Sequence, residues 1–163
     1  MAVQTSYRYF PYRGAAGSLY DISPHLVDSR SNAEQEDGVV RHGLGVVRGT
    51  SPGNNVRLPA TGSTAETFEG LVLNGGTTEM NIQGETILTS HATLSVLRYG
   101  RAWALIPENL EVTYGQQVHL ILTGADRGKF TNVATSNLAL NATFIGPAGS
   151  GSTAPIELYN QRA

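Results

Sequence analysis

The sequence predicts an all-β protein: an antiparallel β-sandwich or barrel of about eight strands, of jelly-roll or related type, with an extended N-terminal arm. Three observations support this fold class. Over the last two thirds of the chain, apolar side chains recur at a period of two in short runs, as strands require. Turn residues separate these runs, and the chain holds 19 Gly and 7 Pro but only 15% charged residues. No segment has the apolar spacing of a convincing amphipathic helix.

Residues 1–27 are predicted to form the arm, and residues 28–163 a single β-domain. Residues 7–20 hold five aromatic side chains and almost no aliphatic ones, and Pro11, Gly14 and Gly17 disfavour a helix. Aromatic and arginine side chains are enriched in interface cores. The arm should therefore bury its rings either on its own domain or on a neighbouring molecule, and the sequence leaves both open. The candidate partner-binding residues are Tyr7, Arg8, Tyr9, Phe10, Tyr12, Arg13 and Tyr20.

The region after the arm is predicted to be irregular. Residues 28–37 are polar and acidic, which predicts a solvated loop. Residues 38–50 carry β-branched pairs interrupted by glycines, a pattern typical of a bent or bulged strand. Residues 50–67 form a turn-rich connection with a short extended piece at 56–59.

The remaining chain is predicted to form a succession of short strands. They are residues 68–73, 80–82, 86–89, 93–98, 102–106, 111–113, 117–123, 138–145 and 156–159. In residues 138–144 the even positions are apolar, so one face of that strand should be buried. Turn chemistry separates the strands, for example at Tyr99-Gly100 and at residues 124–128.

Composition argues against several classes of function. The formal net charge is −2 and Lys129 is the single lysine, so no basic field should attract nucleic acid or an anionic membrane surface. The chain has no cysteine, which excludes disulfides and thiolate metal sites. No secretion signal and no run of 18 apolar residues is evident, so the protein is expected to be soluble and made in the cytosol.

The sequence offers no catalytic, cofactor-binding or metal-binding motif, so none of these sites is predicted. The four histidines lie far apart and form no metal-ligand spacing, although antiparallel strands can bring distant residues together. The acidic residues of the 28–37 segment lack the order of a calcium loop and predict a solvated surface. Catalytic carboxylate pairs cannot be recognised from spacing alone.

Two glycine-rich segments resemble nucleotide-binding loops only superficially. Residues 124–130 have three residues between the glycines, where a phosphate loop needs four, and predict a hairpin loop. Residues 43–49 miss the dinucleotide-binding spacing by one residue and predict a strand. No G-x-S-x-G elbow occurs. Trp103 lies in an alternating strand, where a core or interface anchor is a commoner role than a sugar-stacking platform.

Several fragments together resemble the cement (decoration) proteins of tailed-bacteriophage capsids. The leader resembles that family through Thr5-Ser6-Tyr7, the Gly14 to Gly17 turn and Leu19-Tyr20-Asp21. The resemblance continues through Gly45-Val46-Val47-Arg48-Gly49-Thr50, Val56-Arg57-Leu58-Pro59, residues 96–103, residues 112–118 and Gly128-Lys129-Phe130. It spans nearly the whole chain and is strongest over residues 1–60.

This resemblance implies a β-barrel or jelly-roll body with an extended arm. It also implies a homo-dimer or homo-trimer on the exterior of the virion, bound to the major capsid protein and bridging its neighbouring subunits, after synthesis in the host cytoplasm. An alternative is a β-sandwich module of a phage or extracellular assembly that binds carbohydrate or a receptor. An enzyme is the third possibility, and it would need titratable side chains that converge in one pocket.

Overall fold

The computed structural model describes residues 14–75, 80, 82–84, 86–149 and 152–159. These residues form strands, turns and loops without a helix, which confirms the all-β prediction. The described part of the chain accordingly offers no helix that could cross a membrane. The nine strands are β1 (Leu26–Asn32), β2 (Gly45–Arg48), β3 (Asn55–Arg57), β4 (Phe68–Val72), β5 (Thr93–Leu105), β6 (Gln117–Leu120), β7 (Phe130–Thr131), β8 (Leu138–Phe144) and β9 (Thr153–Tyr159).

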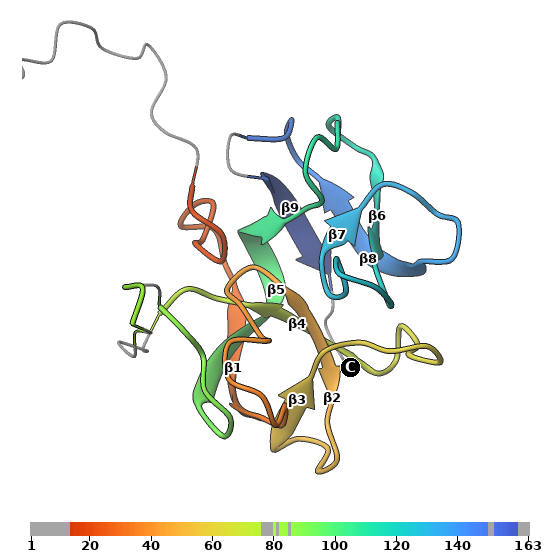
Figure 1. The fold of residues 1–163 in the computed structure, drawn as a ribbon. Coiled ribbons are helices and arrows are strands. Elements are labelled where there is room, and N and C mark those ends of the chain that lie inside the picture. Colours follow the sequence, from red (N-terminus) through yellow and green to blue (C-terminus); the bar gives the residue numbers. More distant parts are fainter. Residues whose placement is uncertain (1–13, 76–79, 81, 85, 150–151, 160–163) are drawn as a thin grey trace, which may run out of the picture.

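Five strands close into a small barrel. The strand order is β1-β3-β2-β4-β5, and β5 pairs again with β1, so this part of the sheet has no free edge. The β1–β3 pair is parallel and the other four pairs are antiparallel. Figure 1 shows the barrel in the lower half of the molecule.

The remaining strands form a second, curved sheet in the order β5-β9-β8-β6-β7. β5 belongs to both parts: residues 93–99 pair with β1, and residues 99–105 pair with β9. At Gly100 the φ angle is +127°, and an added Cβ would lie 2.7 Å from the His25 Cβ. The predicted turn at Tyr99-Gly100 is therefore wrong, because the glycine allows one long strand to change partners instead of reversing the chain.

The main core lies between the second sheet and the outer face of the barrel. Phe68 of β4 packs edge to face on Phe130 of β7, with ring centroids 6.4 Å apart. The β8 side chains Leu140, Ala142 and Phe144 are buried here, which confirms the predicted alternation in residues 138–144. A second apolar cluster, which includes Val46, Val56, Val72, Leu94 and Val96, fills the barrel.

Five charged side chains share the barrel interior with this second cluster. Asp28 Oδ2 lies 2.9 Å from Arg30 Nη2 and 2.9 Å from Arg98 Nη1. Glu69, only 3% exposed, accepts a hydrogen bond from Arg48 Nε at 3.1 Å. Each carboxylate thus compensates the desolvation of guanidinium groups that would be costly to bury alone.

Other element predictions need correction. Residues 28–32 lie in β1, because their charged side chains find partners inside the barrel and need no solvent. Residues 86–89 and 111–113 form no strand. Each segment buries one apolar side chain, Leu88 in the barrel cluster and Val112 in the main core, without pairing in a sheet. Met80 and Thr86 share only an isolated bridge. The two-residue β7 is too short to give a periodic signal.

Candidate functional site

The arm has a root, defined here as residues 14–20, that pairs with β5. Gly17 N–H donates to the Trp103 carbonyl at 2.7 Å, and Trp103 N–H donates to the Ser18 carbonyl at 2.9 Å. Tyr20 N–H donates to the Arg101 carbonyl at 3.0 Å, and Leu19 bridges Ala102. The root therefore occupies a β5 edge that would otherwise expose unpaired backbone groups.

Two glycines shape this root. A Cβ on Gly14 would lie 2.2 Å from Trp103 Cδ1 and Nε1, so only glycine lets the chain pass this closely over the indole ring. Gly17 has a φ angle of +79°, and its added Cβ would lie 2.8 Å from the Asn74 nitrogen. Close packing on Trp103 therefore requires glycine at position 14, whereas position 17 requires it through both close backbone approach and conformation.

A surface beside the root, which we call the β5–β9 face, collects aromatic and charged side chains. The strand register places Tyr99 opposite Tyr159, Arg101 opposite Glu157 and Trp103 opposite Pro155. Directly paired residues point to the same side of a sheet, so these residues share the face turned away from the main core. The β5–β9 face is defined by Tyr20, Asp21, Tyr99, Arg101, Trp103, Glu157 and Tyr159.

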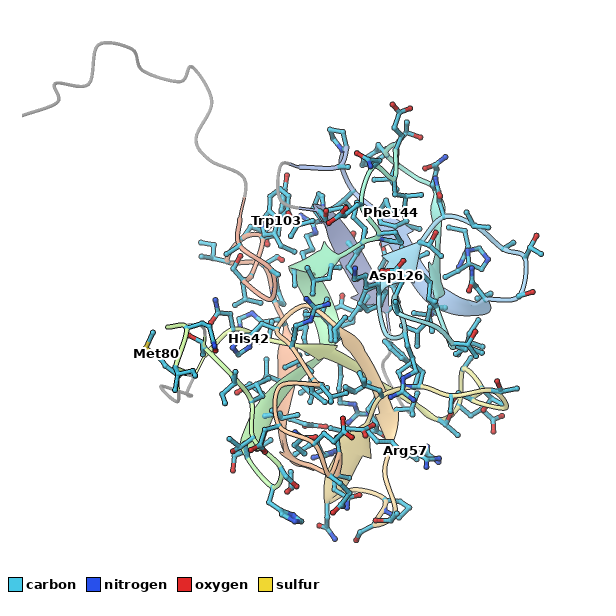
Figure 2. All side chains as sticks on the ribbon, viewed as in Figure 1. His42, Arg57, Met80, Trp103, Asp126 and Phe144 are labelled. Atoms are coloured by element: carbon cyan, nitrogen blue, oxygen red, sulfur yellow. The ribbon has the colours of Figure 1, made fainter. Side chains whose placement is uncertain are left out.

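Two aromatic contacts stand on either side of a central ion pair on this face. The Tyr20 and Trp103 ring centroids are 5.7 Å apart, and those of Tyr99 and Tyr159 are 6.5 Å apart. Trp103 is only 9% exposed, whereas Tyr20 is 43% exposed. Figure 2 places Trp103 where the arm root meets the body. Trp103 thus anchors the root, and Tyr20 offers a ring to solvent or to a partner.

Charge on the face is centred on Arg101. Its Nη1 lies 2.9 Å from Asp21 Oδ2, and its Nε lies 3.5 Å from Glu157 Oε2. Hydrogen bonds from the Ser23 hydroxyl and amide, assisted by Arg101, lower the pKa of Asp21 below its usual 3.8. The bond to Asp21 and the charge of Glu157 raise the pKa of Arg101, so Asp21 and Arg101 both remain ionised at neutral pH.

Tyr159 closes the other end of the face. Desolvation first, and then its hydrogen bond with Glu157, raise the pKa of the Tyr159 phenol above 10. The phenol therefore stays neutral at neutral pH. It can act as a hydrogen-bond donor or acceptor toward a partner, in the manner of tyrosines at interfaces.

The structure places one of the predicted partner-binding residues, Tyr20, on this face. Tyr7, Arg8, Tyr9, Phe10, Tyr12 and Arg13 lie outside the described residues. The sequence prediction did not include Arg101, Tyr99 or Tyr159. Tyr99, Arg101 and Trp103 alternate along one strand, and this pattern could have indicated a shared face. The predicted turn at Tyr99-Gly100 interrupted the strand and hid the pattern.

No group of catalytic character is assembled in the described part of the chain. A hollow of about 470 Å³ beside the arm root has a largely apolar lining, with Arg41 and His42 as its titratable side chains. His42 Nδ1 is 3.1 Å from the Leu73 carbonyl oxygen. Among the described residues, no three His, Asp or Glu side chains lie close enough to hold a metal ion.

Comparison with known proteins gives a family match by sequence and matches to solved chains by structure. A family model described as structural cement protein (E217 gp24/Pam3 gp6) matches residues 3–159. A chain from the solved capsid of Myoviridae phage XM1 superposes with a TM-score of 0.68 at 17% identity, covering 99% of this chain and 100% of that one. At this identity the superposition shows a common fold. No curated protein sequence matches the chain.

Proposed function

The chain belongs to the family of phage structural cement proteins, and we propose that it binds the outside of a phage capsid and bridges neighbouring subunits of the major capsid protein. The observation that carries this proposal is the family match over residues 3–159. The protein then acts by adhesion and needs no catalytic group. Its location is the virion exterior, after synthesis in the host cytoplasm.

The mechanism is linkage between binding and assembly. A protein that binds the assembled lattice but not the dispersed subunits stabilises the lattice by mass action. If a homo-dimer or homo-trimer contacts several subunits at once, the later contacts are effectively intramolecular, so weak individual contacts give tight attachment. The closed barrel and the doubly paired β5 supply a stiff body for such a brace.

The arm and the β5–β9 face are the proposed contact elements. The face combines tyrosines, a tryptophan and an arginine, the residue types that dominate binding energy at interfaces. Pairing of the root with β5 fixes Gly14, the first described residue after the arm residues 1–13, beside this face. We infer that the arm residues Tyr9 and Phe10 are anchors in the same contact.

Deletion of residues 1–13 tests this proposal. The β body should keep its thermal unfolding transition, because its core and the root lie outside the deletion. Co-sedimentation with empty shells that lack the protein should be lost. Attachment that survives the deletion unchanged would refute the arm as a contact element, and failure of the intact protein to sediment with shells would refute the capsid role itself.

A double substitution, Tyr9→Ala with Phe10→Ala, tests whether the aromatic rings of the arm contribute to attachment beyond its backbone. It should weaken shell attachment by about 2 kcal/mol or more, as expected for interface anchors. Tyr114→Ala is the matched control, because Tyr114 is 79% exposed and lies outside the arm and the β5–β9 face. Equal attachment of the double variant and this control would exclude the two rings as anchors.

The oligomeric state is checked independently. A mass measurement of the purified protein should give a dimer or a trimer. If the protein is still a monomer at the concentration at which it saturates shells, the predicted oligomer is wrong. Bridging would then require a single chain to contact neighbouring capsid subunits through several of its own surfaces.

The alternative function, a carbohydrate-binding module, is less well supported by the geometry. A sugar-stacking platform must present the face of an aromatic ring to solvent. Trp103 is 9% exposed and lies under Gly14 and Tyr20. Binding of oligosaccharides to the purified protein, with shifts centred on Tyr20 and Tyr99, would favour the module instead.

A further inference from the structure

A second surface is marked by arginines that form no ion pair with the acidic side chains that the structure describes. Among the described cationic side chains, Arg30, Arg48, Arg98, Arg101 and Lys129 form ion pairs. Arg41, Arg57 and Arg127 form none within the described ranges. Two of these three, Arg57 and Arg127, line neighbouring hollows on either side of the same loop.

These hollows flank the loop of residues 58–67 that connects β3 to β4. One, of about 410 Å³, lies between Ala60, Thr61 and the β6–β7 hairpin, where Thr123 and Arg127 line it. The other, of about 180 Å³, lies between the same loop and strands β2 and β3, where Arg57 lines it. Ala60 and Thr61 border both hollows, so the two lie next to each other across the loop.

We call these two neighbouring hollows together the arginine groove. It is defined by Arg57, Ala60, Thr61, Ser63, Thr123 and Arg127. Figure 2 shows the Arg57 side chain projecting away from the barrel. In Figure 1 the loop, in yellow, emerges on the side of the body opposite the arm root, in red.

Two acids near the groove, Asp126 and Glu69, already pair with other cationic side chains. Asp126 Oδ1 lies 2.7 Å from Lys129 Nζ, which leaves the adjacent Arg127 without that carboxylate. Glu69, below Arg48, accepts from Arg48 Nε. The groove therefore presents two guanidinium groups that form no ion pair with a carboxylate of the described residues.

The loop that borders both hollows is held in place by the fold. Ser63 Oγ accepts a hydrogen bond from the Ala60 amide at 3.0 Å. The loop is fixed at one end by the bond from Leu58 N–H to Glu34 Oε1 at 2.9 Å, and at the other by the bond from Arg48 N–H to the Thr67 carbonyl at 2.9 Å. A loop that is ordered in advance loses little entropy on binding.

We propose that the arginine groove binds carboxylate side chains of an acidic segment on the capsid subunit, as a second attachment surface remote from the arm. Guanidinium groups pair with carboxylates through two parallel hydrogen bonds. A protein carboxylate fits better than a nucleic-acid phosphate, because the net charge of −2 opposes approach to a polyanion. The inference rests on the proposed function and deepens it, since bridging requires contact with more than one neighbour.

Charge reversal tests the groove on shells. The double variant Arg57→Glu with Arg127→Glu should attach at least about tenfold more weakly than the wild type, because like charges then face the partner carboxylates. Wild-type attachment should weaken more steeply than that of the variant between about 50 and 300 mM salt. Arg41→Glu is the matched control, since Arg41 also lacks an ion pair but lies beside the arm root, and it should change attachment less than about twofold.

A second measurement uses the isolated protein and a short poly-glutamate peptide. Amide shifts at Arg57, Thr61 and Arg127 should saturate with added peptide and disappear in the double variant. If the charge-reversed variant does not show the thermal unfolding transition of the wild type, the neutral double variant Arg57→Gln with Arg127→Gln is used in its place. Shifts absent from the groove, or equal shifts produced by a short single-stranded DNA, would overturn the proposal.

Different results would refute the capsid role and the arginine groove. If the wild type attaches to shells and the double variant attaches equally well, the groove is refuted and the capsid role stands. If the wild type binds the peptide at the groove but ignores every shell, the capsid role is refuted and the groove retains its affinity for carboxylates.

Discussion

Trp103→Ala removes the side chain on which the arm root rests, and its effect can be worked out from the structure. Trp103 is 9% exposed and packs against Gly14 and Tyr20. Truncation of a buried tryptophan to alanine costs about 3–5 kcal/mol. The lower end, about 3 kcal/mol, applies because one face of the ring is covered by a single segment that can collapse onto β5. A domain stability of about 5–15 kcal/mol leaves the body folded.

Two assays measure this change. Denaturant unfolding should show the loss of about 3 kcal/mol, against less than about 0.5 kcal/mol for the exposed-ring control Tyr114→Ala. Hydrogen exchange should show faster exchange at the Gly17 and Tyr20 amides, which donate to β5 carbonyls, while β8 amides keep their protection. Unchanged exchange at Gly17 and Tyr20 would refute the anchoring role of Trp103, because the backbone pairing alone would then hold the root.

Three further predictions concern charge and backbone. Glu69→Gln should destabilise the protein by about 3 kcal/mol in denaturant unfolding, because it leaves the partly buried guanidinium groups of Arg30 and Arg48 with one carboxylate fewer. A loss no larger than that of the exposed-site control Glu108→Gln would contradict this. The folded-state pKa of Asp21 lies below 3.8, so the stability that its charge contributes is complete above pH 3.8 and disappears as the pH falls through the folded pKa. The difference in unfolding midpoint between the wild type and Asp21→Asn should therefore be constant from pH 7 to about pH 5 and shrink in more acidic solution, and a constant difference down to pH 2 would be inconsistent with it. Gly70→Ala should cost at least about 2 kcal/mol of unfolding free energy, since its Cβ would lie 2.1 Å from the Leu97 carbonyl oxygen at a φ of +153°, and wild-type stability would show that the β4–β5 pair can move apart.

Local patterns in the sequence predicted much of the sheet. Strand β8 was recognised because apolar residues alternate along it with exposed ones. Strand β1 was not, because its buried face carries Asp28 and Arg30, and charge was interpreted as exposure to solvent. That interpretation fails wherever a fold supplies a counter-charge from a distant strand, here Arg98 and Glu69.

For the candidate site, too, local sequence patterns indicated some residues and not others. Aromatic enrichment in the arm pointed to Tyr20 as a partner-binding residue, and its ring is exposed on the β5–β9 face. The place of Trp103 under the arm root could not be predicted, because it depends on an edge of β5 that is 80 or more residues away in sequence from the root. Long-range pairings of this kind leave no periodic signal in either segment.

By itself the sequence determined the all-β class, the turn-separated strands, the absence of thiol chemistry and the likeness to phage cement proteins, since all of these follow from residue types and their local order. Only the tertiary structure decided that five strands close into a barrel, that β5 serves two sheets, and which arginines are neutralised. The physical reason is that closure, shared strands and charge compensation are properties of pairs distant in the chain. The energy of each such pair depends on a geometry that neither residue specifies alone.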